Sequence, residues 1–235
     1  MRSRPVLAAA SLLAVLALAG CGGDSDSTAT DPGSSPSSAD ASTSESPAAV
    51  ACDYPSDGTT PLKPVEAPPG EPSVSGEVPV LITTSAGKIG ATLDAEAAPC
   101  TVNSFVSLAG QGYFDNSPCH RLTTAASGIS VLQCGDPTGS GRGGPGYSFA
   151  DELSGAETYP AGTLAMANAG PDTNGSQFFM VYGETPLPPD YTVFGELDPA
   201  GLKVVKKIAD EGTSDGGPDG APATPVFITS VTFDD

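Results

Sequence analysis

Two β-type runs joined by an amide-rich loop constrain this chain more than any other stretch. The first run, 162–166 (GTLAM), is strand-like, and the second, 178–182 (FFMVY), is apolar. The loop between them, 167–177, is rich in Gly, Pro, Asn and Asp, residues that supply turn geometry and spare amide groups. The arrangement predicts a place where an extended peptide lies against exposed backbone.

Composition indicates one globular domain. Residues 22 to about 76 are rich in Ser, Thr, Ala, Pro, Asp and Gly, so they cannot bury enough apolar surface to offset chain entropy. The remaining residues, roughly 160, suffice for a single core. With 28 acidic and 9 basic residues, the chain lacks the positive surface that tracks phosphates, and no nucleic-acid partner is expected. We interpret the acidity as favouring solubility outside the cell.

The first residues have the character of an export signal. Arg2 and Arg4 precede an apolar run, 6–19, that is too short to span a bilayer comfortably. The run ends in Leu-Ala-Gly-Cys at 18–21, which resembles the processing box of bacterial lipoproteins. The resemblance implies that 1–20 are a signal peptide and that Cys21 carries the lipid, since two or more acyl chains on one residue suffice for stable anchoring. We therefore expect a protein lipid-anchored at the extracytoplasmic side of the cell membrane; the alternative is an ordinary secretory signal.

The next two segments differ from each other. Residues 21–51 are Ser-, Pro- and Asp-rich, and we expect a disordered tether whose roughly 30 residues reach about 30 Å. Residues 52–76 form a Pro-rich arm that carries Cys52 and Tyr54, which are unusual in a pure linker. We expect Cys52 to pin this arm to the domain, 77–235.

The pattern after residue 77 predicts many short strands and two helices. Alternating apolar residues on both sides of a turn at 85–88 predict a β-hairpin over 78–93. Helices are expected at 99–110 and 201–211. Further strands are expected at 119–122, 128–134, 192–197 and 225–233, with an irregularity near Ser230. This content predicts a mainly β fold, a closed barrel with helices at its ends.

The central stretch, MANAGPDTNGSQFF at 166–179, resembles the signature of the cyclophilin-type peptidyl-prolyl cis-trans isomerases. The family's fold is a closed eight-stranded β-barrel capped by two α-helices, and the expected order of elements agrees with it over 78–233. The resemblance implies an isomerase that assists the folding of exported proteins, with proline-containing polypeptides as clients and without a cofactor.

The resemblance also assigns site residues. Arg121, which follows His120, is implied to be catalytic; His120 we interpret as structural, and as the only His of the chain it does not suggest a metal site. Isomerising an X–Pro bond requires only twisting an amide, and a fixed guanidinium can stabilise the twisted form. Asn168 would bind substrate through its backbone. The other implied substrate-binding residues are Val131, Gln133, Ala167, Ala169, Gln177, Phe179, Leu187 and Tyr191.

The rim of the implied pocket departs from the family pattern. Ser130 stands where the family usually has Phe, and Val131 replaces a Met. Pro186 and Tyr191 stand where better-known members have Trp and His. A Phe at position 130 is expected to restore contact to the proline ring. The altered rim predicts weak cyclosporin binding at most, and it leaves open a proline-peptide-binding module or holdase with weak or no isomerase activity. An acyl hydrolase is not favoured, because no Gly-x-Ser-x-Gly elbow occurs.

Four cysteines follow Cys21: Cys52, Cys100, Cys119 and Cys134. An even number in an exported domain predicts two disulfides, and the absence of a Cys-x-x-Cys pair disfavours zinc. Of the three connectivities we favour Cys100–Cys119 with Cys52–Cys134. The first would tie the first helix to the neighbouring strand, and the second would pin the arm.

Overall fold

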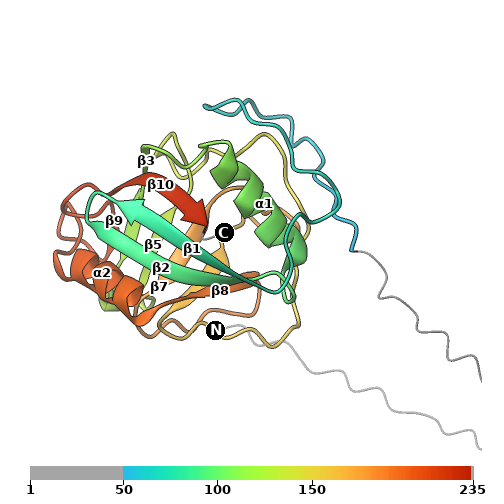
Figure 1. Ribbon diagram of the computed structural model, residues 1–235. Helices are drawn as coiled ribbons and strands as arrows, with labels where there is room; N and C mark the ends of the chain where they lie inside the picture. Colours follow the sequence, from blue (N-terminus) through green and yellow to red (C-terminus); the bar gives the residue numbers. More distant parts are fainter. Residues whose placement is uncertain (1–49, 234–235) are drawn as a thin grey trace, which may run out of the picture. The chain divides into compact units, whose positions relative to one another are not determined.

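The structure is a computed structural model that describes residues 50–233 (Figure 1). The expectations for the signal peptide, for lipidation of Cys21 and for nearly all of the tether lie outside the described residues. Within 50–233, neither helix combines the length and the apolar character needed to cross a membrane.

The expected hairpin is present as β1 (Glu77–Thr84) and β2 (Gly87–Asp94). The two strands pair without interruption from Glu77–Asp94 to Thr84–Gly87. Alternate side chains enter the core, among them Val80, Ile82, Ile89 and Leu93, as the period of a strand requires.

All strands of the described residues join in one sheet that curls around the core (Figure 1), in the order β3-β10-β1-β2-β8-β6-β7-β5-β4-β9. The remaining bounds are β3 (Ser117–Pro118), β4 (Arg121–Thr123), β5 (Val131–Cys134), β6 (Thr163–Met166), β7 (Phe178–Val181), β8 (Val193–Leu197), β9 (Asp219–Gly220) and β10 (Phe227–Phe233).

The prediction of a closed eight-stranded barrel is wrong in detail. The sheet has ten strands because two-residue strands, β3 and β9, extend its two ends. Pro118 in β3 lacks the amide hydrogen that would continue a ladder. The chain itself bridges the two ends, since β3 leads through Cys119 and His120 into β4, the neighbour of β9.

The irregularity expected near Ser230 is confirmed. Thr83 pairs with Ser230, whereas Thr84 pairs with Ile228, so the register between β1 and β10 shifts by one residue. Such a bulge bends a strand and increases its twist, which suits a sheet that curls.

Two helices pack on the sheet (Figure 1): α1 (Pro99–Gly110) contacts β10 and β2, and α2 (Pro199–Asp210) contacts β2 and β8. The first has no capping side chain at its N-cap, but the Glu152 carboxylate accepts from the amides of Cys100 (2.9 Å) and Thr101 (2.8 Å). The second begins two residues before the predicted start, because Asp198 caps it and Pro199 occupies its first turn.

The core lies between α1 and the sheet. Phe105 of α1 contacts the rings of Phe114, Phe178 and Phe194, with centroid distances of 5.0, 5.5 and 5.5 Å. All four side chains are buried. This aromatic group fixes α1 on the strands that carry Phe178 and Phe194.

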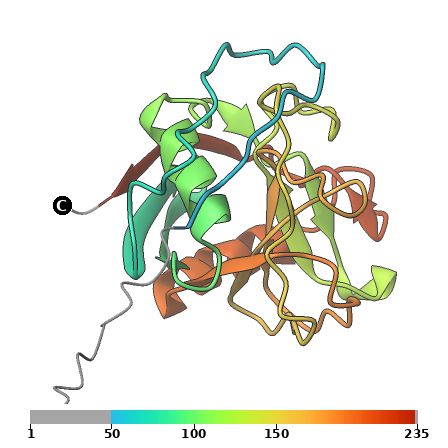
Figure 2. The same cartoon turned by 90° about the vertical axis from the view of Figure 1, so that its right-hand side faces the viewer.

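The arm, 52–76, is pinned at Cys52 as expected. Figure 2 shows the arm, coloured blue to cyan, passing the green helix α1 toward a yellow segment. Ser56 of the arm pairs with Tyr147. The predicted pairing is wrong: the disulfides are Cys52–Cys100 and Cys119–Cys134. The arm crosses the start of α1, where Cys52 and Cys100 have Cα atoms 5.4 Å apart. The antiparallel register that pairs Arg121 with Gln133 also brings Cys119 beside Cys134.

Candidate active site

One row of side chains crosses four strands on the outer face of the sheet. The registers pair Arg121 of β4 with Gln133 of β5, Gln133 with Phe179 of β7, and Phe179 with Ala165 of β6. Because strand side chains alternate, Phe178 enters the core while Phe179 belongs to a separate cluster on the other face. The sheet therefore places a cation, an amide and an apolar surface side by side.

The apolar end of this row is the outer apolar cluster. Its partly exposed rim includes Ala167, Leu187 and Tyr191, and its buried members are Val131, Tyr159, Ala165, Phe179 and Val181. The ring of Tyr191 stands edge-on to that of Phe179, with centroids 5.5 Å apart. The structure thus brings together Val131, Phe179, Leu187 and Tyr191, as predicted.

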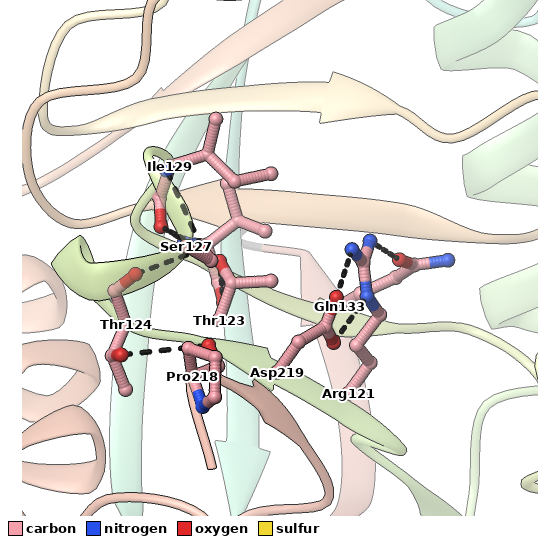
Figure 3. Close-up of polar contacts among 9 residues, drawn as sticks. Arg121, Thr123, Thr124, Ser127, Ile129, Gln133, Pro218 and Asp219 are labelled. Carbon is pink, nitrogen blue, oxygen red and sulfur yellow. Dashed lines mark hydrogen bonds and ion pairs between the residues drawn. The ribbon is translucent and has the colours of Figure 1, made fainter.

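The polar end is a chain of hydrogen bonds, the polar chain, from Asp219 to Gln177. Arg121 donates from Nε (2.8 Å) and Nη2 (2.6 Å) to the two carboxylate oxygens of Asp219. Its Nη1 donates to Gln133 Oε1 at 3.2 Å. Figure 3 shows the guanidinium between these two side chains. Gln133 Nε2 then donates to Gln177 Oε1 (2.9 Å), and Gln177 Nε2 donates to the Gly143 carbonyl (2.9 Å).

The pKa shifts of the ion pair reinforce its charged state. The hydrogen bond to Asp219 raises the pKa of Arg121 above its usual value. The hydrogen bond from Arg121 lowers the pKa of Asp219 below the ordinary range of a carboxyl group. Both groups are therefore ionised at neutral pH.

The backbone at Asn168 is open to a peptide. The side chain of Asn168 serves the loop, donating to the Asp190 carbonyl (2.9 Å) and accepting from the Gly170 amide (3.2 Å). Within 50–233, its own N–H and C=O have no hydrogen-bond partner. An extended peptide can pair with such free groups as an added strand. The Ala169 amide, in contrast, donates to Thr173.

A cleft of about 430 Å³ continues the site beyond Asn168. Gln133, Gln177 and the backbone of 167–169 form one side, and the glycine loop (135–146) contributes 141–145. The arm contributes Asp57 and Thr59, because Ser148 donates to the Pro55 carbonyl (3.0 Å) and Asp57 to the Gly146 carbonyl (3.2 Å). Nothing in the arm's composition indicated that it reaches the site.

Asp136 organises the glycine loop. Its carboxylate accepts from the amides of Thr138 (2.7 Å), Gly141 (2.8 Å) and Gly143 (3.0 Å). Although burial raises the pKa of Asp136, these hydrogen bonds lower it below its usual value. The carboxylate thereby fixes the Gly143 carbonyl that receives Gln177.

His120 takes no part in the polar chain. Burial lowers the pKa of its ring, and among the described residues neither ring nitrogen has a hydrogen-bond partner. The ring lies beside Gly141 of the glycine loop. This agrees with a structural role.

The expectation that a Phe at position 130 would contact the proline ring is wrong, because this position is buried. Ser130 is buried, its amide donates to Thr185 Oγ1 (3.0 Å), and a Cβ added at Gly183 would lie 3.0 Å from its own Cβ. Because side chains alternate along a strand, Val131 and Ile129 lie on the same outer face as Gln133, and Ser130 does not. Ile129 indeed packs against the outer apolar cluster.

Sequence reasoning missed four residues of the site. Ile129 was detectable from strand alternation, but no local pattern marked the others, which are Tyr159, Val193 and Asp219. Tyr159 accepts from the Tyr191 amide (3.0 Å) and so fixes the rim of the outer apolar cluster.

A larger cleft, of about 530 Å³, is lined by the acidic residues Glu77, Asp94, Glu152, Glu157 and Glu196. Glu152 is already engaged with the first turn of α1. None of the predicted site residues lines this cleft, so we assign the site to the smaller one.

Known proteins resemble this chain over the region that contains the site. The family described as "Cyclophilin type peptidyl-prolyl cis-trans isomerase/CLD" matches residues 79–233, which include the polar chain but not the arm. A "Probable peptidyl-prolyl cis-trans isomerase B" of Mycobacterium tuberculosis is 52% identical over 197 residues, covering 78% of this chain and 64% of that protein. The chain thus spans less than two thirds of this relative's length.

Two further similarities agree with these. The Mycobacterium leprae "Probable peptidyl-prolyl cis-trans isomerase B" is 49% identical over 199 residues, covering 79% of this chain and 67% of that protein. A crystal structure of a cyclophilin type peptidyl-prolyl cis-trans isomerase from Cryptosporidium parvum has a TM-score of 0.60 at 30% identity. It covers 68% of this chain and 98% of the solved chain.

Proposed function

Because this chain belongs to the cyclophilin-type peptidyl-prolyl cis-trans isomerases, we propose that it isomerises X–Pro bonds in polypeptides. The observation that carries the proposal is the Arg121 guanidinium, fixed between Asp219 and Gln133 on the row that also bears Phe179. A cation held beside an apolar surface suits a bond that joins a carbonyl to a pyrrolidine ring.

The chemistry needs neither a nucleophile nor a proton transfer. An X–Pro bond rotates slowly because amide resonance must be lost, at a barrier of roughly 18–20 kcal/mol. In the twisted amide the nitrogen becomes pyramidal and more basic, so a hydrogen bond to it is stronger in the transition state than in the ground state. An acceleration of about 10⁵ corresponds to roughly 7 kcal/mol of differential binding.

Arg121 has donors to spare for this role. A guanidinium carries five N–H donors, and Asp219 and Gln133 engage three of them. Two donors remain for the substrate amide. The proline ring would rest on the outer apolar cluster, and the residue before it would pair with the backbone of Asn168. Residues further toward the N-terminus would enter the cleft beside the arm.

We also propose that the full chain acts at the outer face of the cytoplasmic membrane, on exported proteins. Support comes from the Leu-Ala-Gly-Cys box at 18–21 and from the two disulfides, since such bonds persist in oxidising compartments outside the cytosol. Replacing Cys21 with Ser should release the protein from membranes. An unchanged membrane fraction would refute the lipid anchor.

The second candidate is a holdase or proline-peptide-binding module with little turnover. The observation that favours it is the rim of the outer apolar cluster, where Tyr191 packs at the position at which better-known family members have His. The same rim supports weak cyclosporin binding at most. A protease-coupled assay on a proline peptide separates the two candidates: an isomerase speeds the slow cis-to-trans phase, whereas a holdase binds the peptide without changing that rate.

A further inference from the structure

We propose that Asp219 is the positioning residue for the Arg121 guanidinium, holding its two free donors toward the twisted X–Pro amide. The proposal rests on the isomerase function and adds to it a carboxylate from a part of the chain far from the signature loop. Asp219 and Arg121 are 98 residues apart in sequence.

Strand pairing brings the carboxylate to the site. The short strand β9 pairs with β4, with Asp219 opposite Thr123 and Gly220 opposite Leu122. Thr123 and Arg121 are two residues apart and share one face of β4. The side chain of Asp219 therefore lies on the face of Arg121 and reaches it diagonally, a distance that long side chains cover between adjacent strands.

The segment that carries Asp219 is itself held in place. The Thr124 amide donates to the Pro218 carbonyl at 2.8 Å, and the Thr124 hydroxyl lies 3.4 Å from the same oxygen (Figure 3). Behind it, the carboxylate of Asp215 accepts from the Gly217 amide (2.9 Å) and from the Thr213 hydroxyl (3.0 Å). Asp219 is thus presented by a hydrogen-bonded loop with a fixed register on β4.

The contact orients the guanidinium in a definite way. Asp219 takes the edge formed by Nε and Nη2 with two hydrogen bonds, and Gln133 takes one donor of Nη1. A two-point contact fixes the plane of the group as well as its place. One donor of Nη1 and one of Nη2 remain, and these belong to adjacent nitrogens. These two N–H donors are therefore available to hydrogen-bond a ligand.

The pairing is selective in this chain. Although the chain has 28 acidic and 9 basic residues, the Arg121–Asp219 pair is the single ion pair within residues 50–233. Its side chains are 39% and 43% exposed, and a pair so exposed contributes little to folding stability. The pair instead fixes the orientation of the Arg121 guanidinium, and the rate of a catalysed reaction depends strongly on such orientation.

A double-mutant cycle tests the proposal. Wild type, Asp219→Ala, Arg121→Ala and the double variant are assayed for kcat and KM on a proline peptide. We expect Asp219→Ala to lower kcat about fivefold to tenfold with KM within about twofold. In the Arg121→Ala background, Asp219→Ala should change nothing further, because its effect passes through the guanidinium.

Two additional variants separate positioning from loss of charge. Asp219→Asn keeps one oxygen acceptor for the guanidinium and should retain more of kcat than Asp219→Ala. Glu211→Gln is the matched control: it removes one exposed carboxylate from the end of α2, and Glu211 forms no ion pair. It should leave kcat unchanged.

The Nε–H signal of Arg121 in a ¹⁵N NMR spectrum provides a readout without turnover. We expect a slowly exchanging signal in wild type that exchanges faster in Asp219→Ala and is unaffected in Glu211→Gln.

Three results would overturn the proposal. Equal losses from Asp219→Ala in both backgrounds would make Asp219 a purely structural residue. A rise in kcat on its removal would make it a competitor of the substrate. An unchanged Nε–H exchange rate in Asp219→Ala would show that it does not hold Arg121. If wild type has no turnover, the isomerase function fails separately, and the NMR comparison still decides whether Asp219 orients the guanidinium.

Discussion

Breaking the Cys52–Cys100 disulfide should lower stability and alter the cleft together. We consider the double variant Cys52→Ser/Cys100→Ser. The bridge spans 48 residues of sequence, and closing a loop of that length removes chain entropy from the unfolded state worth about 4 kcal/mol. The free energy of unfolding should therefore fall by about that amount. Urea denaturation followed by circular dichroism measures it, provided that the transition remains two-state.

The arm has other contacts, which supply a control. Tyr54 is buried and donates to the Cys100 carbonyl at 2.7 Å. Tyr54→Phe removes this hydrogen bond and the one that the hydroxyl accepts from Asn103 Nδ2 (3.1 Å). The variant keeps the disulfide, and it should cost only about 1–2 kcal/mol. If the double Ser variant costs no more than Tyr54→Phe, the disulfide does not constrain the unfolded chain as argued.

The same variant tests whether the arm belongs to the site. Asp57 and Thr59 line the cleft, whereas the polar chain lies outside the arm. Loosening the arm should therefore raise KM for peptides long enough to enter the cleft and leave kcat nearly unchanged. Equal KM values for wild type and variant, on short and long peptides alike, would refute a role of the arm in substrate binding.

Three other predictions follow from the site. Ser130→Phe should lower the free energy of unfolding by about 1–3 kcal/mol in a denaturant titration, because Ser130 is packed against Gly183; unchanged stability with tighter peptide binding would contradict this packing. Asp57→Lys should shift kcat/KM by about threefold toward peptides with Glu, and away from those with Lys, ahead of the X–Pro pair, since it reverses an exposed charge on the cleft; identical selectivity would show that Asp57 does not face the substrate. The pH profile of kcat should be flat between about pH 5 and 8, because the pKa of Asp219 is lowered, that of Arg121 is raised, and burial lowers that of His120. Ionised Asp219 should stabilise the folded protein above the unfolded pKa of Asp, and this stabilisation should be lost only as the pH falls through the lowered folded pKa. A step in kcat near neutral pH would contradict the proposed roles.

Sequence alone predicted the parts of the fold that depend on local periodicity. The hairpin of β1 and β2 and the buried stripe of α1 follow from alternation at periods of 2 and 3.6 residues, which the chain displays directly. The bulge opposite Thr83 was also visible as a break in alternation near Ser230.

The parts that sequence missed depend on pairing between distant segments. Cys119 meets Cys134 because of the register between β4 and β5, and Cys52 meets Cys100 because the arm crosses the start of α1. Neither follows from spacing. The two-residue strands β3 and β9 are too short to show a period.

The candidate site divides in the same way. The family resemblance predicted residues of the signature stretch and of the segment around Gln133, and the structure brings Gln133, Gln177 and Phe179 to one face. Asp219 was missed because β9 reaches β4 only in the folded sheet. Ser130, which directly precedes β5, was misjudged because the family pattern alone does not show which side of the sheet a residue faces.

The most direct test of the central claim is the kcat/KM of Arg121→Ala on a proline peptide, measured beside the dissociation constant for the same peptide. If Arg121 acts on the twisted amide, kcat/KM should fall at least about tenfold, or roughly 1.4 kcal/mol of transition-state stabilisation. Peptide binding should change by less than about twofold. Arg121→Lys is the matched variant, because it keeps the charge but loses the planar two-point contact with Asp219; it should resemble Arg121→Ala. Equal losses in binding and turnover would make Arg121 a general anchor for peptide, and no loss in either would place the site elsewhere.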